Sequence, residues 1–202
     1  MLLALVLGYL LGSIPFGLIL TRLAGKGDVR QIGSGNIGAT NVLRTGSKWL
    51  AAMTLILDCL KATVAIVVAH ALFESDLFGF GPASLVAAAG AMIGHLYPVW
   101  LGFKGGKGAA TLLGILIPLL PIGALVYAVV WLILLLTTRI SSVAGMAAAV
   151  SAPVTAFVLK EKTLLPMLLG FTVLVLWKHR ENILRLRKGT EPRIGSKTSS
   201  TA

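Results

Sequence analysis

Long apolar stretches separated by short polar loops constrain the fold of this 202-residue chain more than any other feature. The chain is 56% hydrophobic and 12% charged, with a mean hydropathy of +0.91, which is typical of proteins that cross a membrane several times. Since a spanning helix needs about 20 apolar residues, this length allows about five to seven spans. The sequence predicts an all-α polytopic integral membrane protein with one membrane domain over 1–191 and a basic polar tail over 192–202.

The number of spans depends on the uncharged stretch 109–138. Three polar motifs, at 33–44, 94–111 and 179–191, face the same side only if an even number of crossings separates the second from the third. A short helical hairpin within 109–138, bent in the Pro118–Pro121 region, meets this condition and favours seven spans. A five-span alternative, in which one later stretch does not cross, also meets it. The expected spans are 1–21, 49–73, one within 77–103, two within 109–138, 143–159 and 163–177.

Basic residues set the expected orientation. The net charge is +11, and 15 of the 18 Lys and Arg residues fall in loops on one predicted side. The positive-inside rule makes this side cytoplasmic, which places the N-terminus outside and the C-terminus inside. Arg22, the first cation, follows the first apolar stretch, unlike the basic start of a signal peptide. Aromatic residues do not alternate with a basic stripe, so nucleic acid is not an expected partner.

Ionisable side chains interrupt the predicted span 49–73. Asp58 and Lys61 are three residues apart and share a helix face. Charges at this depth are costly and usually face the protein interior in pairs. Two interpretations stay open for them: a structural ion pair that orients the helix, or a role in the substrate site or in supporting its loops. The single cysteine, Cys59, excludes an intramolecular disulfide and offers no zinc spacing.

The first polar motif is a glycine-rich loop that ends in a cation. Its glycines leave the backbone open, its hydroxyl and amide side chains supply hydrogen-bond donors, and Arg44 can hold a phosphate through two donors. Such a loop is ordinarily just a turn when it stands alone, and its coincidence with the other two motifs favours phosphate binding instead. The candidate phosphate-binding residues here are Gly33, Ser34, Gly35, Asn36, Gly38, Thr40, Asn41 and Arg44.

The second motif, Lys104-Gly-Gly-Lys-Gly108, combines glycines with two cations beside an apolar stretch. We expect bare backbone N–H groups and lysine charge to favour an anion. The motif lacks the Walker spacing, because Gly108 and not Ser or Thr follows Lys107, so nucleotide hydrolysis is not expected. The candidates are His95, Lys104, Gly105, Gly106, Lys107, Gly108 and Thr111, with a purely structural role open for His95.

The third motif begins where the last apolar stretch ends. His179 could donate to phosphate or transfer a proton, and Asn182 shares its helix face. Ser142, beside Arg139, is either a helix cap or another phosphate donor. The sequence contains no Ser-His-Asp set, no pair of carboxylates suited to acid–base catalysis and no metal-ligand cluster, so no cofactor or metal is expected. Catalysis would then rest on positioning and charge stabilisation.

Taken together, the three motifs closely resemble the bacterial membrane acyl-phosphate:glycerol-3-phosphate acyltransferase family. The segments that carry the resemblance are GSGNIGATNVLR (33–44), GHLYPVWLGFKGGKGAAT (94–111) and HRENILRLRKGTE (179–191). The resemblance implies acyl transfer from acyl phosphate to the 1-hydroxyl of sn-glycerol 3-phosphate, giving 1-acylglycerol 3-phosphate (lysophosphatidate) and phosphate. This is the first acylation of phospholipid synthesis. It also implies a place in the bacterial cytoplasmic (inner) membrane, with an active site that faces the cytoplasm, an acyl tail that lies between helices, and membrane lipid as a partner.

The resemblance further implies roles for individual residues. Glycerol 3-phosphate binding falls to 104–108, and the other glycine, amide and hydroxyl candidates named above are expected to bind substrate. The expected catalytic residues are Ser34, Arg44, Lys104, Ser142, His179 and Asn182. Whether His179 or the substrate phosphate accepts the proton stays open, as does a homodimeric state. The rival functions are a phosphate-ester transporter, a lipid-binding scaffold, and an acyltransferase that uses acyl-CoA.

Overall fold

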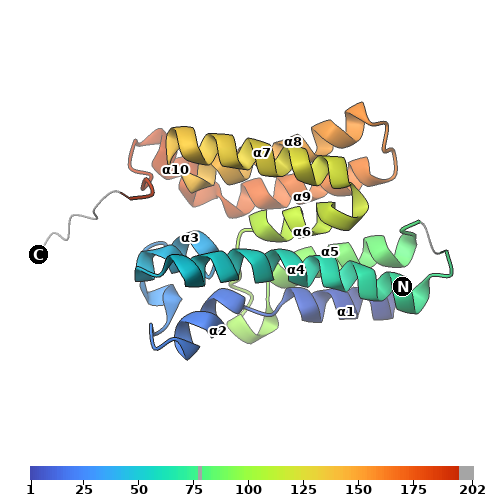
Figure 1. Cartoon of the computed structure of the whole chain (residues 1–202), viewed down its shortest axis with the longest axis horizontal. Coiled ribbons are helices and arrows are strands. Elements are labelled where there is room, and N and C mark those ends of the chain that lie inside the picture. Colours follow the sequence, from blue (N-terminus) through green and yellow to red (C-terminus); the bar gives the residue numbers. More distant parts are fainter. Residues whose placement is uncertain (77–78, 196–202) are drawn as a thin grey trace, which may run out of the picture. The chain divides into compact units, whose positions relative to one another are not determined.

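The computed structural model describes residues 1–76 and 79–195, and in that part of the chain every regular element is a helix (Figure 1). The all-α class is therefore confirmed. The chain divides into two compact units, Met1–Ala124 and Leu125–Ala202. The predicted membrane domain, 1–191, includes residues of both units, and the predicted basic tail lies outside the described residues from 196 onwards.

Helices of very different length make up the two units. The first unit contains α1 (Leu2–Gly12), α2 (Phe16–Leu23), η1 (Val29–Gln31), α3 (Ala39–Val42), η2 (Leu43–Thr45), α4 (Lys48–Phe73), α5 (Pro82–Leu96), η3 (Val99–Leu101), α6 (Ala109–Leu119) and the start of α7 (Pro121–Thr138). The second unit contains the rest of α7, α8 (Ser141–Val158), α9 (Leu164–Lys178) and α10 (Arg180–Arg187).

Among the described residues, five helical segments are long and apolar enough to cross a membrane. Two shorter apolar helices, α6 and α9, accompany them. The prediction of a multi-pass protein is thus confirmed. α6 ends at Leu119 and α7 begins at Pro121, within the region where the sequence predicted a bend. The five segments are Leu2–Leu23, Lys48–Phe73, Pro82–Leu101, Pro121–Thr138 and Ser141–Val158.

The first span departs from the uninterrupted helix expected over 1–21. α1 ends at Gly12 and α2 begins at Phe16, with Pro15 between them. Proline has no N–H and blocks the preceding turn, so a break here leaves backbone carbonyls to be satisfied by other groups. Trp100 Nε1 donates to Ser13 O (2.8 Å), and Lys61 Nζ donates to Ile14 O (2.8 Å). The break is therefore closed by side chains from elsewhere in the first unit.

Small residues let the helices of the first unit approach closely. α1 lies along α5 (Figure 1), and a Cβ on Gly8 or Gly12 would overlap the backbone of Ala87 or Ala91. Gly90 and Gly94 of α5 meet the backbone of α1 in the same way. Membrane helices associate through such small-residue contacts because lipid supplies no hydrophobic force between them. This packing fixes α5, whose C-terminal end leads into the second motif.

The second unit repeats this use of small residues. On α8 the buried residues include Ala144, Ala148, Ala149, Ala152 and Ala156. Thr172 of α9 donates its hydroxyl to Ala149 O (2.8 Å), which joins the two helices. Large apolar side chains such as Val173 stay exposed, as expected of a surface that meets lipid. α9 then carries the third motif at its end.

Candidate active site

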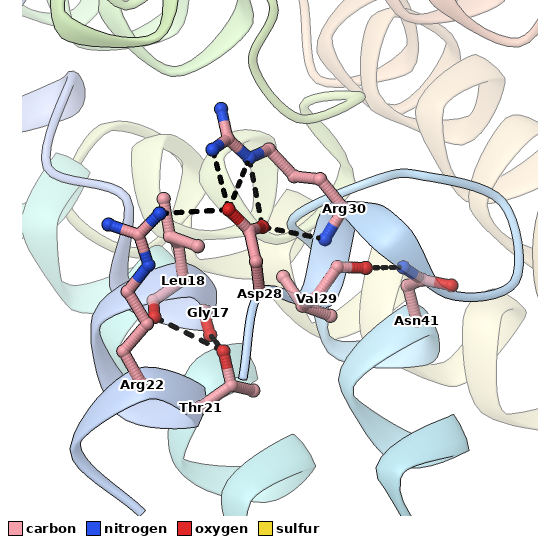
Figure 2. Close-up of polar contacts among 8 residues, drawn as sticks. All are labelled: Gly17, Leu18, Thr21, Arg22, Asp28, Val29, Arg30 and Asn41. Carbon is pink, nitrogen blue, oxygen red and sulfur yellow. Dashed lines mark hydrogen bonds and ion pairs between the residues drawn. The ribbon is translucent and has the colours of Figure 1, made fainter. Parts of the chain in front are cut away.

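The first motif is organised around the side chain of Asn41. This side chain is 2% exposed, and its Nδ2 donates to the carbonyls of Val29 (2.8 Å), Ile32 (3.0 Å) and Asn36 (2.7 Å). Its Oδ1 accepts from Ser34 N (3.0 Å). Figure 2 shows the bond to Val29. Asn41 thus closes the loop on itself, so the structure uses this predicted substrate ligand to shape the backbone.

The closed loop leaves its polar groups on the outside. Ser34, Thr40 and Arg44 are exposed. Gly33 has a φ of +55°, which favours glycine, and a Cβ there would overlap the Arg44 side chain and Asn41 Oδ1. The structure therefore lays Arg44 against the backbone next to Ser34. Of the eight residues predicted in this motif, Ser34, Thr40 and Arg44 have exposed polar side chains, and binding of an anion by them stays a prediction.

Asp28 fixes the start of the same loop, and sequence reasoning missed it (Figure 2). Its carboxylate accepts from Arg30 N (3.0 Å), Arg30 Nη2 (2.6 Å) and Arg22 Nη2 (2.8 Å). The Arg30 side chain, helped by the Arg30 N–H and by Arg22 against the opposing effect of burial, holds the pKa of Asp28 well below its usual range. The only signal in the sequence was an acid between two arginines. Asp28 anchors η1, whose first carbonyl then receives Asn41.

The lysine–glycine loop, 104–108, folds back onto the end of α5. Gly105 N donates to Leu96 O (3.2 Å) and Gly106 N donates to His95 O (3.0 Å). A Cβ on Gly105 would overlap His95 O, and one on Gly106 would overlap the His95 ring. Both N–H groups are thus engaged by α5, contrary to the expectation that they point at an anion. The two glycines serve close packing, and substrate binding by them stays a prediction.

The other residues of the second motif divide into an exposed and a buried set. Lys104 is exposed and Lys107 is half-buried, just before α6 begins. His95 (4% exposed) and Thr111 (fully buried) face the protein interior instead. Thr111 Oγ1 donates to Asp58 O (3.4 Å), and His95 Nδ1 lies 3.9 Å from Asp58 Oδ1. These two predicted substrate ligands therefore support the loop from within the helices.

An apolar base connects the first two motifs. Leu18, Val29, Ile37, Val42 and Ala51 form a buried cluster under the first loop. Leu101, three residues before Lys104, packs against this same cluster. The structure therefore brings the two loops of the first unit onto one hydrophobic support.

In the second unit the carboxylate of Glu191 binds three side chains, two of which, Ser142 and Asn182, are predicted site residues. Glu191 Oε1 accepts from Ser142 Oγ (2.6 Å) and Asn182 Nδ2 (2.6 Å), and its Oε2 accepts from Arg185 Nε (2.7 Å). Burial acts to raise the pKa of Glu191, but these donors outweigh burial and lower it. Sequence reasoning missed the role of Glu191, although it closes the third motif. Ser142 and Asn182, predicted together, are indeed brought together.

His179 lies where α9 gives way to α10 and is 4% exposed. Its Nδ1 is 2.8 Å from Val175 O. A carbonyl only accepts, so this bond requires a proton on Nδ1 and leaves Nε2 as the acceptor in the neutral ring. That tautomer is compatible with proton acceptance at Nε2. Among the described residues no group of three or more His, Cys, Asp or Glu side chains is arranged to hold a metal ion.

Comparison with known proteins extends these observations to the whole chain. The glycerol-3-phosphate acyltransferase family profile matches residues 2–189. Glycerol-3-phosphate acyltransferases of Brucella anthropi (57% identical over 96% of this chain and 93% of the relative) and Erythrobacter litoralis (54%, 96% and 95%) are similar along their length. The crystal structure of PlsY (YgiH), an integral membrane glycerol 3-phosphate acyltransferase, in its glycerol 3-phosphate form, matches with a TM-score of 0.87 and 39% identity over 96% of this chain and 95% of that one. Its lysophosphatidic acid form gives a TM-score of 0.84 at 38% identity, with the same coverage. The chain belongs to the glycerol-3-phosphate acyltransferase family.

Proposed function

We propose that this protein transfers an acyl group from acyl phosphate to the 1-hydroxyl of sn-glycerol 3-phosphate, releasing 1-acylglycerol 3-phosphate and phosphate. The observation that carries the proposal is the match to one enzyme family over residues 2–189, which includes the first two polar motifs and the third up to residue 189. The related PlsY is known in forms with glycerol 3-phosphate and with lysophosphatidic acid, a substrate and a product of this reaction. Acyl phosphate as the donor follows from the family resemblance of the motifs.

Glycerol 3-phosphate is assigned to the lysine–glycine loop. Lys104 is exposed there, and Lys107 lies just before the first turn of α6, where helix N–H groups and the helix dipole also favour an anion. The hydrogen bonds from Gly105 and Gly106 to α5 hold the loop in place. A fixed loop positions the 1-hydroxyl of the substrate at low entropic cost.

The remaining motifs supply further phosphate donors. Arg44 offers a planar guanidinium, and the neighbouring Ser34 offers a hydroxyl. In the second unit Ser142 and Asn182 are oriented by Glu191, so we assign them to phosphate holding and transition-state stabilisation. Asn41 and Glu191 are assigned to shaping these groups.

The proposed reaction is a direct displacement at the acyl carbonyl. The 1-hydroxyl oxygen forms the new ester bond, and the bond between the acyl carbon and the phosphate oxygen breaks with its electron pair on phosphate. The hydroxyl proton goes either to the departing phosphate or to His179 Nε2. Because acyl phosphate is an activated anhydride with a good leaving group, no protein nucleophile is required.

We also propose seven crossings, with the N-terminus outside and the motifs facing the cytoplasm of a bacterial inner membrane. The support is the seven apolar helical segments of residues 1–76 and 79–195, counting α1 and α2 together, and the positive charge of the loops. α6 is only 11 residues long, about 16 Å, so it would insert partly. A cysteine at Lys160, in a Cys59→Ser background, should react with an impermeant maleimide from outside intact cells, whereas labelling only after lysis would contradict this topology.

The activity test uses purified protein in detergent with palmitoyl phosphate and glycerol 3-phosphate. Phosphate and lysophosphatidate should appear in equal amounts, and palmitoyl-CoA in a parallel reaction should give no product. Product from palmitoyl-CoA would overturn the donor assignment. A folded preparation that releases nothing with either donor would overturn the enzymatic function.

A further inference from the structure

A buried charged pair on α4 lies outside the machinery described so far. Lys61 Nζ is 2.8 Å from Asp58 Oδ1, and the two side chains are 2% and 3% exposed. Both lie within the candidate span Lys48–Phe73. Removing two charges from water costs free energy that their attraction barely repays, so a buried pair is weak evidence of a stabilising role. The contacts of the pair indicate a different use.

Lys61 reaches the break in the first span. Its Nζ donates to Ile14 O (2.8 Å), between α1 and α2, and lies 5.9 Å from the centroid of the Phe16 ring. Trp100, four residues before Lys104, donates to the adjacent carbonyl of Ser13. Lys61 and the segment that enters the lysine–glycine loop therefore hold the same three-residue break, Ser13–Pro15.

Asp58 lies beside residues on both sides of the lysine–glycine loop. Its carboxylate is 3.9 Å from Nδ1 of His95, whose ring packs against Gly106 and whose carbonyl receives the Gly106 N–H. Its backbone carbonyl accepts from Thr111, in the first turn of α6. Asp58 thus sits where α5 ends and α6 begins, on the buried side of the loop.

We propose that Asp58 and Lys61 are positioning residues for the lysine–glycine loop. Asp58 fixes the His95 ring that supports Gly106, and Lys61 fixes the broken span against which Trp100 anchors the loop entrance. Neither residue touches substrate. The proposal rests on the assignment of glycerol 3-phosphate to this loop. It predicts a selective effect on that substrate, because the phosphate donors that we assign outside the loop, and that remain for acyl phosphate, do not contact Asp58 or Lys61 in any interaction described above.

The test removes both charges at nearly constant volume in Asp58→Asn/Lys61→Met. This double variant leaves no uncompensated buried charge, so it should fold and keep a melting temperature near that of the parent protein. Its KM for glycerol 3-phosphate should rise about tenfold to a hundredfold, since small misplacements of a binding loop have effects of this size. Its KM for palmitoyl phosphate should change by less than about twofold. If the double variant loses its fold, Asp58→Glu carries the test, because it keeps the charge pair with Lys61 and displaces only the carboxylate that faces His95.

Two companion variants make the outcome specific. Thr63→Val removes another bond from α4, to Gly114 O of α6 (2.7 Å), and should leave both KM values unchanged. Lys104→Ala is the reference for loss of glycerol 3-phosphate binding. If Lys104→Ala raises the KM for glycerol 3-phosphate and the neutral pair does not, the positioning role is wrong. If Lys104→Ala leaves that KM unchanged, the loop assignment fails instead. Equal increases in both KM values for the double variant would indicate general loosening and would also overturn the proposal.

Discussion

Two buried side chains organise polar motifs in this protein, and they do so with different chemistry. In the first unit the neutral amide of Asn41 binds three carbonyls and one N–H of a single loop. In the second unit the carboxylate of Glu191 binds three side chains from α8 and α10. The amide shapes a backbone, and exposed groups on that backbone then meet substrate. The carboxylate orients proposed substrate-binding side chains directly. Loss of Glu191 should therefore lower catalytic activity more than loss of Asn41.

The largest effect is expected for Glu191→Ala. Ser142, Asn182 and Arg185 would lose their common acceptor, and two of these are proposed to contact phosphate. We expect kcat/KM to fall by about a hundredfold or more and the free energy of unfolding to fall by about 2–4 kcal/mol. Initial rates and thermal unfolding in detergent measure both. Glu161→Ala, which removes an exposed acid from the same unit, is the matched control. An equal loss of kcat/KM and stability in Glu161→Ala would contradict the proposed role of Glu191.

A smaller loss is expected for Asn41→Ala. The loop would keep Asn36 Oδ1 on Gly38 N, and Asp28 on Arg30 N, so its backbone would loosen without collapsing. We expect kcat/KM to fall about tenfold and the free energy of unfolding to fall by about 1–3 kcal/mol. Thr45→Ala, which removes only a local bond to Val42 O, should change neither. We call Asn41 and Glu191 hubs, because each side chain binds several groups of one motif. A loss of kcat/KM in Asn41→Ala as large as that in Glu191→Ala would contradict the proposed difference between the two hubs.

The sequence indicated which residue types each motif offers for phosphate binding, but it did not indicate the structural role of each residue within the motif. Composition and the spacing of apolar stretches were enough for an all-helical multi-pass fold, and the break near Pro121 followed from its prolines. Periodicity could not reveal the break at Ser13–Pro15, because the groups that satisfy its carbonyls, Lys61 and Trp100, are far away in the chain.

The same limit explains the residues that were missed or reassigned. Glycines at 105 and 106 suit an anion and suit close packing equally well, and only the neighbouring His95 ring distinguishes the two. Asp28 and Glu191 each stand among cations that, in the sequence, suggest only an inside-positive loop. Their importance lies in partners brought to them by folding, which residue type and spacing do not encode.

A third hub, in the turn between α4 and α5, sharpens the comparison because it lies outside the motifs. Glu74 accepts from His70 Nδ1 (2.7 Å), Gly81 N (2.8 Å) and Ser84 N (2.9 Å). Glu74→Gln should lower the free energy of unfolding by about 1 kcal/mol and leave kcat/KM within about twofold. Thermal unfolding and initial rates on the same preparation test this. A tenfold loss of activity at unchanged stability would show that a hub outside the motifs also affects catalysis.

The smallest effect concerns pH, and it separates a carboxylate hub from an amide hub. Burial acts to raise the pKa of Glu74, but the donors from His70, Gly81 and Ser84 outweigh it and lower the pKa to about 2 from an ordinary value of 4.5. The pKa of Glu191 is also lowered, by Ser142, Asn182 and Arg185 against the effect of burial.

A lowered pKa means that the unfolded chain takes up the proton first as pH falls. The stability from each group is therefore complete above about pH 4.5 and declines below it. The gap in melting temperature between the parent protein and Glu191→Gln should narrow by about 2–4 °C between pH 6 and pH 4, whereas the gap for Asn41→Ala should stay constant. If the melting-temperature gap of Glu191→Gln is as independent of pH as that of Asn41→Ala, the charge of Glu191 does not contribute to stability.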